Sequence, residues 1–127
     1  MSTESNIART VAPEDIRPGA YVTILHVIDE FLPLVFDSND ASWRSVQPFR
    51  VRWLPYGDQS PMKVKSVCLP FVFVMLPDGA HRTLDVRRHQ LAEVARDYGR
   101  SVFEAARDRR KRRAKKQAKK RRKKKAR

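Results

Sequence analysis

Hydrophobic and polar residues alternate along several short segments of this chain, which is the pattern of half-buried β-strands. Phe49, Val51 and Trp53 fall on one face of an extended chain, and the basic residues between them fall on the other. Segments of this kind are rich in β-branched and aromatic residues. They predict strands at residues 20–28, 48–53, 62–69, 71–76 and 81–86.

Turn-forming residues separate these segments. Pro77 presets its φ angle and Gly79 accepts a left-handed one, so residues 77–79 are expected to close a hairpin. Both faces of residues 71–76 are apolar, which predicts a central strand of a curved sheet. Residues 29–48 combine an apolar segment broken by a proline with a cluster of Asp, Ser and Asn, and we interpret them as a long loop.

The two ends of the predicted sheet are less regular. Residues 91–94 fit either a short closing strand or the beginning of a helix. Ser101 and Glu104 match a capping box, so a helix is expected by that point. The predicted organisation is a flexible leader (1–15) that ends in one helical turn, a small β-barrel (16–94), the start of an amphipathic helix (95–106) and a polybasic tail (107–127).

Charge is distributed very unevenly along the chain. Residues 107–127 contain 16 Lys and Arg and one acid, a net charge of +15, whereas residues 1–106 contain 12 bases and 13 acids. A block of like charge this dense repels itself and cannot be buried, so it indicates a polyanionic partner. Nucleic acid is the predicted partner. The alternative is a tail that only keeps the protein in solution.

Two opposing effects decide the conformation of this tail. Ala, Lys, Arg and Gln all favour a helix. Ten pairs of like charges at i,i+4 oppose it, and at roughly 0.2–0.5 kcal/mol each they cost about 2–5 kcal/mol. The balance predicts a segment that is frayed when free and becomes a helix about 30 Å long when phosphates neutralise it.

Other features of the sequence predict the compartment. The single Cys68 excludes an internal disulfide, and the polar residues 1–6 do not resemble a signal peptide. The longest apolar run, residues 67–76, contains a proline and is well short of the roughly 20 residues that cross a bilayer. We therefore expect a soluble cytoplasmic protein without a transmembrane segment.

The predicted elements resemble a known group of folds. Residues 16–25 (Ile-Arg-Pro-Gly-Ala-Tyr-Val-Thr-Ile-Leu) are similar to the opening turn and strand of Src-homology-3-like (SH3-like) barrels, and residues 79–94 to their closing part. The similarity is to the nucleic-acid-associated, KOW-type barrels of ribosomal and transcription factors. Over residues 16–94 it implies a mainly β fold, a barrel of about five strands, followed by a basic helix or a disordered tail.

Basic residues on two predicted strands suggest a binding surface. They occupy alternate positions of strands that are expected to be neighbours, with aromatic residues nearby, and such a surface suits phosphates and stacked bases. The alternative is that they are only the solvated face of a sheet. The full predicted nucleic-acid-binding set, with the tail, is Arg50, Arg52, Lys63, Lys65, Arg82, Arg87, Arg88, Arg109, Arg110, Lys111, Arg112, Arg113, Lys115, Lys116, Lys119, Lys120, Arg121, Arg122, Lys123, Lys124 and Lys125.

Three aromatic residues, Trp43, Trp53 and Tyr56, predict a different kind of site. Residues 18–43 contain four acids and no Lys or Arg, so an acidic loop is expected beside these rings. An acidic loop over an aromatic floor is how SH3-like barrels hold basic or Pro-rich peptides. The second hypothesis is therefore a protein-interaction module whose tail is only an electrostatic anchor.

Residues suited to catalysis or metal binding are not arranged in a pattern typical of either. The spacing of Cys68, His26, His81 and His89 resembles no zinc motif, and Cys68 is expected to be a small buried thiol. Asp85 has a histidine close in sequence, but there is no nucleophile elbow or phosphate-binding glycine loop. The sequence predicts a non-enzymatic protein without cofactor or metal, and RNA or a ribosome is favoured over DNA as its partner.

Overall fold

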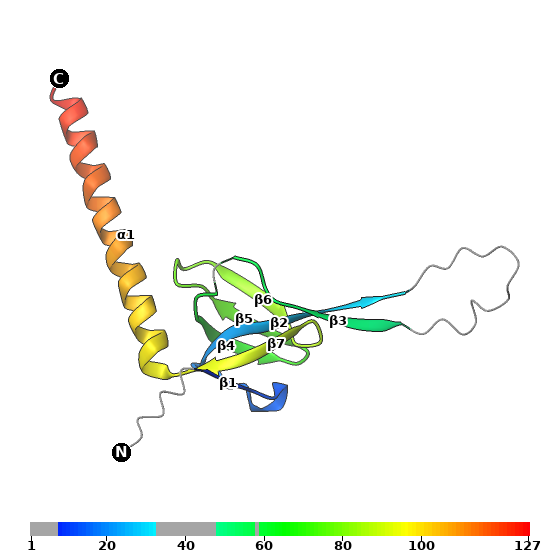
Figure 1. The fold of residues 1–127 in the computed structure, drawn as a ribbon. Helices are drawn as coiled ribbons and strands as arrows, with labels where there is room; N and C mark the ends of the chain where they lie inside the picture. Colours follow the sequence, from blue (N-terminus) through cyan, green and yellow to red (C-terminus); the bar gives the residue numbers. More distant parts are fainter. Residues whose placement is uncertain (1–7, 33–47, 58) are drawn as a thin grey trace, which may run out of the picture.

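The computed structural model describes residues 8–32, 48–57 and 59–127. In this part the protein is mainly β, with seven antiparallel strands in one sheet and a single α-helix at the C-terminus (Figure 1). A short 3-10 helix, Pro13–Asp15, confirms the helical turn that the sequence predicts there. The elements are β1 (Ala8–Thr10), β2 (Tyr21–Phe31), β3 (Phe49–Trp53), β4 (Met62–Cys68), β5 (Phe71–Met75), β6 (His81–Asp85), β7 (His89–Val94) and α1 (Arg96–Lys125).

Strand β2 organises the sheet. The strand order is β1-β7-β2-β4-β5-β6, and β3 is a further partner of β2. The first half of β2 pairs with β7, and its first two residues also pair with β4, while Val27 to Phe31 pair with β3. Figure 1 shows the consequence: β2 and β3 extend from the sheet as a two-stranded ribbon, away from α1.

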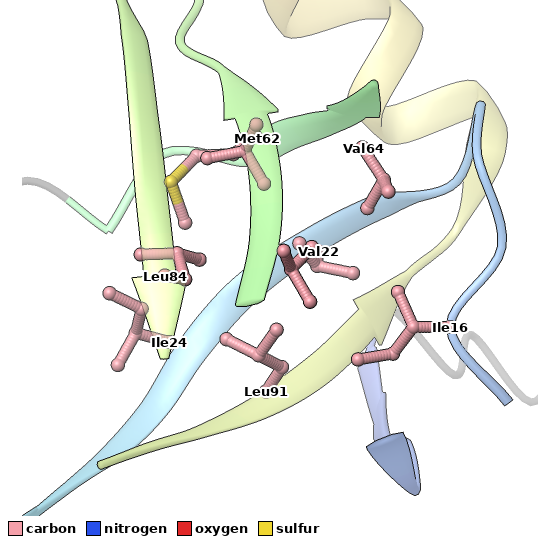
Figure 2. Packing of buried hydrophobic residues seen from close by; sticks show 9 residues of the cluster. Ile16, Val22, Ile24, Met62, Val64, Leu84 and Leu91 are labelled. Atoms are coloured by element: carbon pink, nitrogen blue, oxygen red, sulfur yellow. The ribbon is translucent and has the colours of Figure 1, made fainter. Parts of the chain in front are cut away.

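The hydrophobic core lies on one face of this sheet (Figure 2). Alternate residues of β2, β4, β5 and β6 point into it, as the two-residue period of a strand requires. Ile16, just after the 3-10 helix, covers one end of it. The buried cluster consists of Ile16, Val22, Ile24, Met62, Val64, Val72, Val74, Leu84 and Leu91.

Two predictions of local structure are confirmed. Gly79 has a φ angle of +92°, and the Leu76 N–H donates to the Ala80 carbonyl at 2.7 Å, so residues 77–79 form the expected hairpin turn. Residues 91–94, which fit either strand or helix by sequence, belong to β7. The helix follows directly after β7.

β5 lies between β4 and β6, which confirms the predicted central strand, whereas the prediction of a buried Cys68 is wrong. Only one face of β5 is buried: Val72 and Val74 are almost fully buried, whereas Phe71 and Phe73 are each 40% exposed. No element of the described chain covers that outer face of β5, so its apolar pattern does not mean burial on both sides. Cys68 is exposed, because β4 ends there at the turn into β5.

The boundaries of three segments also differ from expectation. Residues 8–10 of the expected leader form β1, which pairs with β7. The long loop expected from residue 29 begins later, because β2 continues to Phe31 and pairs with β3, where the rings of Phe31 and Phe49 stack at 5.8 Å. The rest of that loop, residues 33–47, lies outside the described residues. Ser101 lies inside α1 and its hydroxyl donates to the Tyr98 carbonyl, so it is not a helix cap.

Helix α1 is attached to the sheet through its first turns only. The rings of Tyr21 and Phe103 meet edge to face at 5.3 Å between centroids. Gly99 lies so close to Tyr21 that a Cβ there would be 2.3 Å from the Tyr21 Cγ. Ala106 is buried, and every residue from 107 onward is exposed. In the structure the tail continues α1 as a projecting helix to Lys125, which is one of the two conformations expected for it.

Candidate functional site

A groove with a volume of about 410 Å³ lies between α1 and the sheet. Apolar residues at the open end of the core form its floor. One wall is a single face of α1, where residues recur every three or four positions. Another wall is formed by residues 55, 56, 59 and 60, with the β5–β6 turn and residues of β6 and β7. We call this hollow the basic groove. Its principal lining residues are Ile24, Val27, Tyr56, Met62, Asp78, Arg82, His89, Val102, Ala106, Arg109, Arg110 and Arg113.

Arginine side chains from two distant parts of the chain meet in the basic groove. Arg82 pairs with the buried Val74, so it leaves β6 on the core face, at the end of the sheet. Arg109 and Arg113 come from the wall formed by α1. Within the described residues, none of these three guanidinium groups has an ion pair or a hydrogen bond. They are available to an anion.

Arg110 has a different role in the same groove. Its Nη1 donates to the Asp78 carbonyl at 2.7 Å, and this bond fastens α1 to the β5–β6 turn. Gly79 leaves room for it, since a Cβ at that position would be 2.7 Å from the same nitrogen. The Asp78 carboxylate accepts a hydrogen bond from the Ala80 N–H at 2.9 Å. Asp78, the one acid among the described residues that line the groove, is therefore occupied within its own turn.

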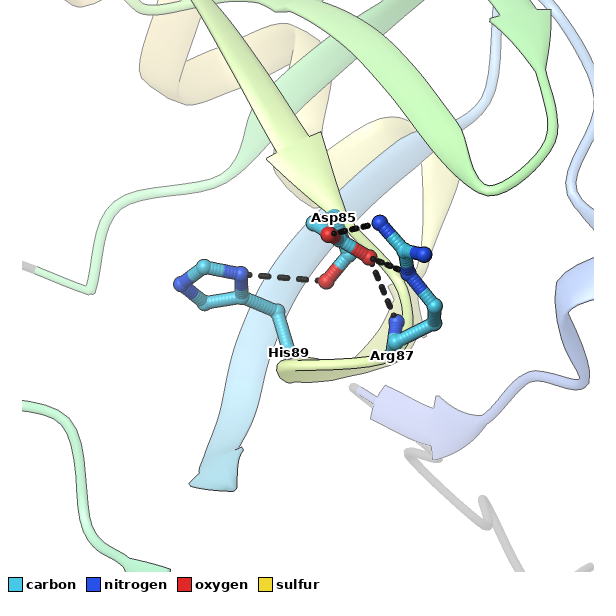
Figure 3. Close-up of polar contacts among 3 residues, drawn as sticks. All are labelled: Asp85, Arg87 and His89. Carbon is cyan, nitrogen blue, oxygen red and sulfur yellow. Dashed lines mark hydrogen bonds and ion pairs between the residues drawn. The ribbon is translucent and has the colours of Figure 1, made fainter. Parts of the chain in front are cut away.

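His89 presents a neutral ring to the groove. Its Nδ1 lies 3.2 Å from the Asp85 carbonyl (Figure 3), and because that oxygen only accepts, Nδ1 must carry the proton. Burial lowers the pKa of His89 below its ordinary value of 6.5, and the charges of Arg82 and Arg88 act in the same direction. The neutral ring then has Nε2 free as an acceptor.

Asp85 and Arg87 form a compact structural turn beside His89 (Figure 3). The Asp85 carboxylate accepts bonds from the Arg87 backbone N–H at 2.9 Å, from its Nε at 3.0 Å and from its Nη2 at 2.8 Å. These bonds lower the pKa of Asp85 to about 2. The Arg87 guanidinium also lies 5.8 Å from the centre of the Phe71 ring. The Asp85 carboxylate is thus committed to the turn, and no base or nucleophile among the described residues bonds to it.

Several predicted phosphate ligands do not gather in one surface. Arg50 pairs with Glu30 on β2 and Lys63 with Tyr21, so β2 separates them by nine residues, or about 30 Å at 3.3 Å per residue. The expectation that the two strands are neighbours is therefore wrong, because each pairs with a different end of β2. Their companions Arg52 and Lys65 are exposed on the same strands.

Arg87 and Arg88 lie beside acids. Arg87 bonds to Asp85 as described, and Arg88 forms an ion pair with Asp29 at 3.2 Å. The tail cations are exposed on every side of α1, and only the first turns of the tail face the groove. The predicted tail ligands on α1 are Arg109, Arg110, Lys111, Arg112, Arg113, Lys115, Lys116, Lys119, Lys120, Arg121, Arg122, Lys123, Lys124 and Lys125.

Two of the three predicted aromatic residues lie together. Trp53 and Tyr56 line a shallow hollow of about 370 Å³ with Val27, Asp29 and Leu54. Tyr56 also lines the basic groove, and it is 97% exposed. Trp43 lies outside the described residues.

Sequence reasoning missed the basic groove as a unit. The sequence suggests His89 only as a metal ligand or a catalytic residue, and it suggests the apolar residues of the floor only as part of the core. The spacing of Val102, Ala106 and Arg110 was a signal for one shared helix face. The position of Arg82 beside that face depends on strand pairing, which no local pattern reveals.

Searches for metal sites, membrane helices and relatives add no further site. No group of three or more His, Cys, Asp or Glu side chains in the described chain is placed to hold a metal ion. The described helices include none that is long and apolar enough to span a bilayer. Comparisons with protein-family models, curated proteins and solved structures find no match. Function has to be argued from the geometry of this chain.

Proposed function

We propose that this protein binds nucleic acid without catalysing a reaction. The observation that carries the proposal is α1: 16 Lys and Arg of residues 107–127 follow one exposed helix whose first turns are fastened to a folded body. At about 1.5 Å per residue this is roughly one positive charge per 2 Å of helix. Duplex nucleic acid has about one negative charge per 1.7 Å, so the two charge densities are similar.

The body contributes orientation to this contact. Tyr21, Gly99 and Phe103 hold the base of α1 on β2, and Arg110 holds it to the β5–β6 turn. Arg82, Arg109 and Arg113 extend the positive surface from the helix into the basic groove. A rod attached in this way presents its charges to phosphates at a defined angle to the sheet.

For the finer identity of the fold, we propose that β2, β4, β5, β6 and β7 form an SH3-like barrel around the core. The hairpin at Gly79, the single turn before β7 and the pairing of β7 with β2 support this assignment. RNA, including that of the ribosome, is the favoured partner over DNA because of the resemblance to ribosomal barrels. A cytoplasmic location belongs to the same proposal.

The test is the salt dependence of binding. Fluorescence anisotropy of a labelled 16-base-pair RNA or DNA duplex would be measured with the full chain between 50 and 200 mM salt. If the helix engages six to ten phosphates, the affinity should fall by about 10³–10⁵ over that range. A chain ending at Arg113, which lacks ten Lys and Arg, should show a much weaker affinity and a smaller salt slope.

A matched control distinguishes charge from sequence. A chain in which residues 114–127 are scrambled keeps length, composition and charge, so it should bind as the natural chain does. The double substitution R50Q and R52Q removes two charges from β3, which pairs with the end of β2 far from α1. It should change binding little. A salt-independent affinity, or full binding by the shortened chain, would contradict the proposal.

A second candidate function is supported by the exposed aromatic side chains near the β2–β3 ribbon. Phe31 and Phe49 are more than 40% exposed, Trp53 is 46% exposed and Leu54 75% exposed. Apolar side chains concentrated in this way are typical of a surface that binds another protein. The shortened chain separates the two functions, because it should lose nucleic acid but keep a protein partner bound through the ribbon.

A further inference from the structure

We propose that the basic groove binds one unpaired nucleotide of a single-stranded nucleic acid. Its phosphate lies among Arg82, Arg109 and Arg113, and its base stacks on Tyr56. This inference rests on the proposed function and names the form of nucleic acid that the body itself recognises. The projecting part of α1 then attracts any nucleic acid regardless of sequence. The groove adds a preference for single-stranded over double-stranded nucleic acid.

The charge of the groove supports this inference. Three guanidinium groups face one hollow, and none has an anionic partner in the described chain. Among the described residues, the lining contains one carboxylate, that of Asp78, which accepts the Ala80 N–H. Guanidinium groups bind phosphate oxygens through two parallel hydrogen bonds, so a set of three suits a phosphate better than a spherical ion such as chloride.

The exposed ring of Tyr56 also supports the inference. A tyrosine 97% exposed contributes nothing to the core, so its ring is open to a ligand. The Gln59 side chain donates to the carbonyls of Tyr56 and Gly57, at 3.4 and 3.3 Å, and the Thr23 hydroxyl donates to the Gln59 carbonyl at 3.1 Å. These bonds hold the backbone of Tyr56 and Gln59 beside β2, which places an exposed ring at the edge of the groove, and nucleobases stack on such rings.

The groove between the Tyr56 ring and the arginines also has a chemistry that suits a nucleotide. Ile24, Val27 and Met62 give the groove an apolar floor, which suits the body of a base. The neutral ring of His89 offers Nε2 as an acceptor, which an exocyclic amine or a ribose hydroxyl can satisfy. The groove thus combines a cationic side, an apolar floor and one acceptor.

The dimensions of the groove favour an unpaired nucleotide. A volume of about 410 Å³ lies in the range of roughly 300–1,000 Å³ that holds small ligands. A base inside a duplex could reach it only after leaving its stack, which costs free energy that an unpaired base does not need. Beyond Arg113 the same helix continues into the exposed tail, so a strand that leaves the groove meets further cations.

The experiment compares strands and variants. Affinities of the full chain for a single-stranded RNA 12-mer and for a hairpin duplex with the same number of phosphates would be measured at 150 mM salt. A 2-aminopurine base in the single strand reports stacking by its fluorescence. Y56A should weaken single-strand binding by about 5- to 140-fold and abolish the fluorescence change, and it should leave duplex binding almost unchanged. R82Q should weaken single-strand binding more than duplex binding, because the duplex loses only one charge of the extended positive surface.

Control variants and outcomes keep the two proposals separate. Y98A removes a partly exposed aromatic outside the groove, and R52Q removes one charge outside it, so neither should alter the strand preference. If Y56A and R82Q affect both strands equally or neither, the groove inference is overturned while the proposed function stands. If the groove binds an acidic peptide instead, Y56A and R82Q will not change the affinity for either strand, and the groove inference is again overturned. Failure of every oligonucleotide to bind at 50 mM salt overturns both.

Discussion

At the scale of single residues, the close contact between Gly99 and Tyr21 decides how α1 leaves the sheet. In an exposed helix, alanine in place of glycine stabilises by about 1 kcal/mol. Here the added Cβ would lie 2.3, 2.6 and 2.7 Å from three atoms near the root of the Tyr21 side chain. Those atoms cannot rotate away, because Tyr21 is buried in a paired strand. The steric cost therefore exceeds the gain in helix propensity.

We predict that G99A lowers the free energy of unfolding by about 1–3 kcal/mol, the usual cost of overpacking. Urea denaturation followed by circular dichroism measures it. The same substitution in a Y21A background should cost less, because the two ring atoms are gone and only the contact with the Cβ of residue 21 at 2.7 Å remains. An additive effect of the two substitutions would show that the contact does not restrict the helix.

His89 provides a prediction at the same scale, about pH. Its pKa is lowered in the folded protein by burial, so the unfolded chain takes up a proton first as the pH falls below about 6.5. The stability present above that pH should therefore decrease on acidification. Asp85, with its pKa lowered to about 2, loses its stabilising bonds only as the pH falls from 3.8 through about 2. The two effects occupy separate pH ranges.

Denaturation midpoints at pH 7.5 and pH 5.0 measure the histidine effect. H89Q keeps a side-chain donor for the Asp85 carbonyl and removes the titration, so the difference between the two midpoints should shrink. H81Q, at an exposed position of β6, is the matched control and should leave the difference unchanged. An equal pH dependence of the natural chain and H89Q would contradict the assignment.

At the scale of elements, α1 contains two parts with different sources of stability. Its first turns are held by Tyr21, Phe103 and the buried Ala106. Beyond Arg113 the helix has no contact with the sheet. That outer part depends on intrinsic helix propensity alone, against repulsion of about 1–3 kcal/mol from its six like-charged i,i+4 pairs. Its helix content should therefore respond to anything that neutralises it.

Circular dichroism at 222 nm should show more helix when a short duplex or 1 M salt is added to the full chain at low ionic strength. Q117E places an acid four residues before Arg121, so its helix content should be higher at low salt and should change less on neutralisation. Q117A, which adds no charge, is the control. A signal that neither phosphates nor salt changes would show that repulsion is unimportant.

At the scale of the whole molecule, β2 connects two ends of opposite character. Its first residue supports the cationic helix, and its last residues carry Asp29 and Glu30 into the ribbon with β3. The body of residues 1–106 is nearly neutral, with 12 bases and 13 acids. If α1 binds a polyanion as proposed, the molecule should be oriented with α1 and the basic groove toward the phosphates, because the apolar ribbon extends away from α1 (Figure 1).

Local features of this molecule could be predicted from its sequence. The alternation around Val51, the turn at Gly79 and the charge of residues 107–127 are all properties of neighbouring residues. The two-residue period of a strand, the left-handed conformation of a glycine in a turn and the charge density of a segment can each be predicted without knowing the rest of the fold. The mainly β class, the hairpin and the helical turn before Ile16 followed from them. The buried face of β5 could not be predicted in this way, because burial depends on which other elements pack against the strand.

The site itself was decided only by the tertiary structure. Arg82 meets Arg109 and Arg113 because β6 lies at the end of a sheet whose order places it beside α1, and Arg50 is kept from Lys63 because their strands pair with opposite ends of β2. Contacts between residues far apart in the chain depend on strand pairing and register. Strand pairing and register are set by packing of the whole core. The sequence alone therefore specified the charged residues, and the fold determined which of them lie close together.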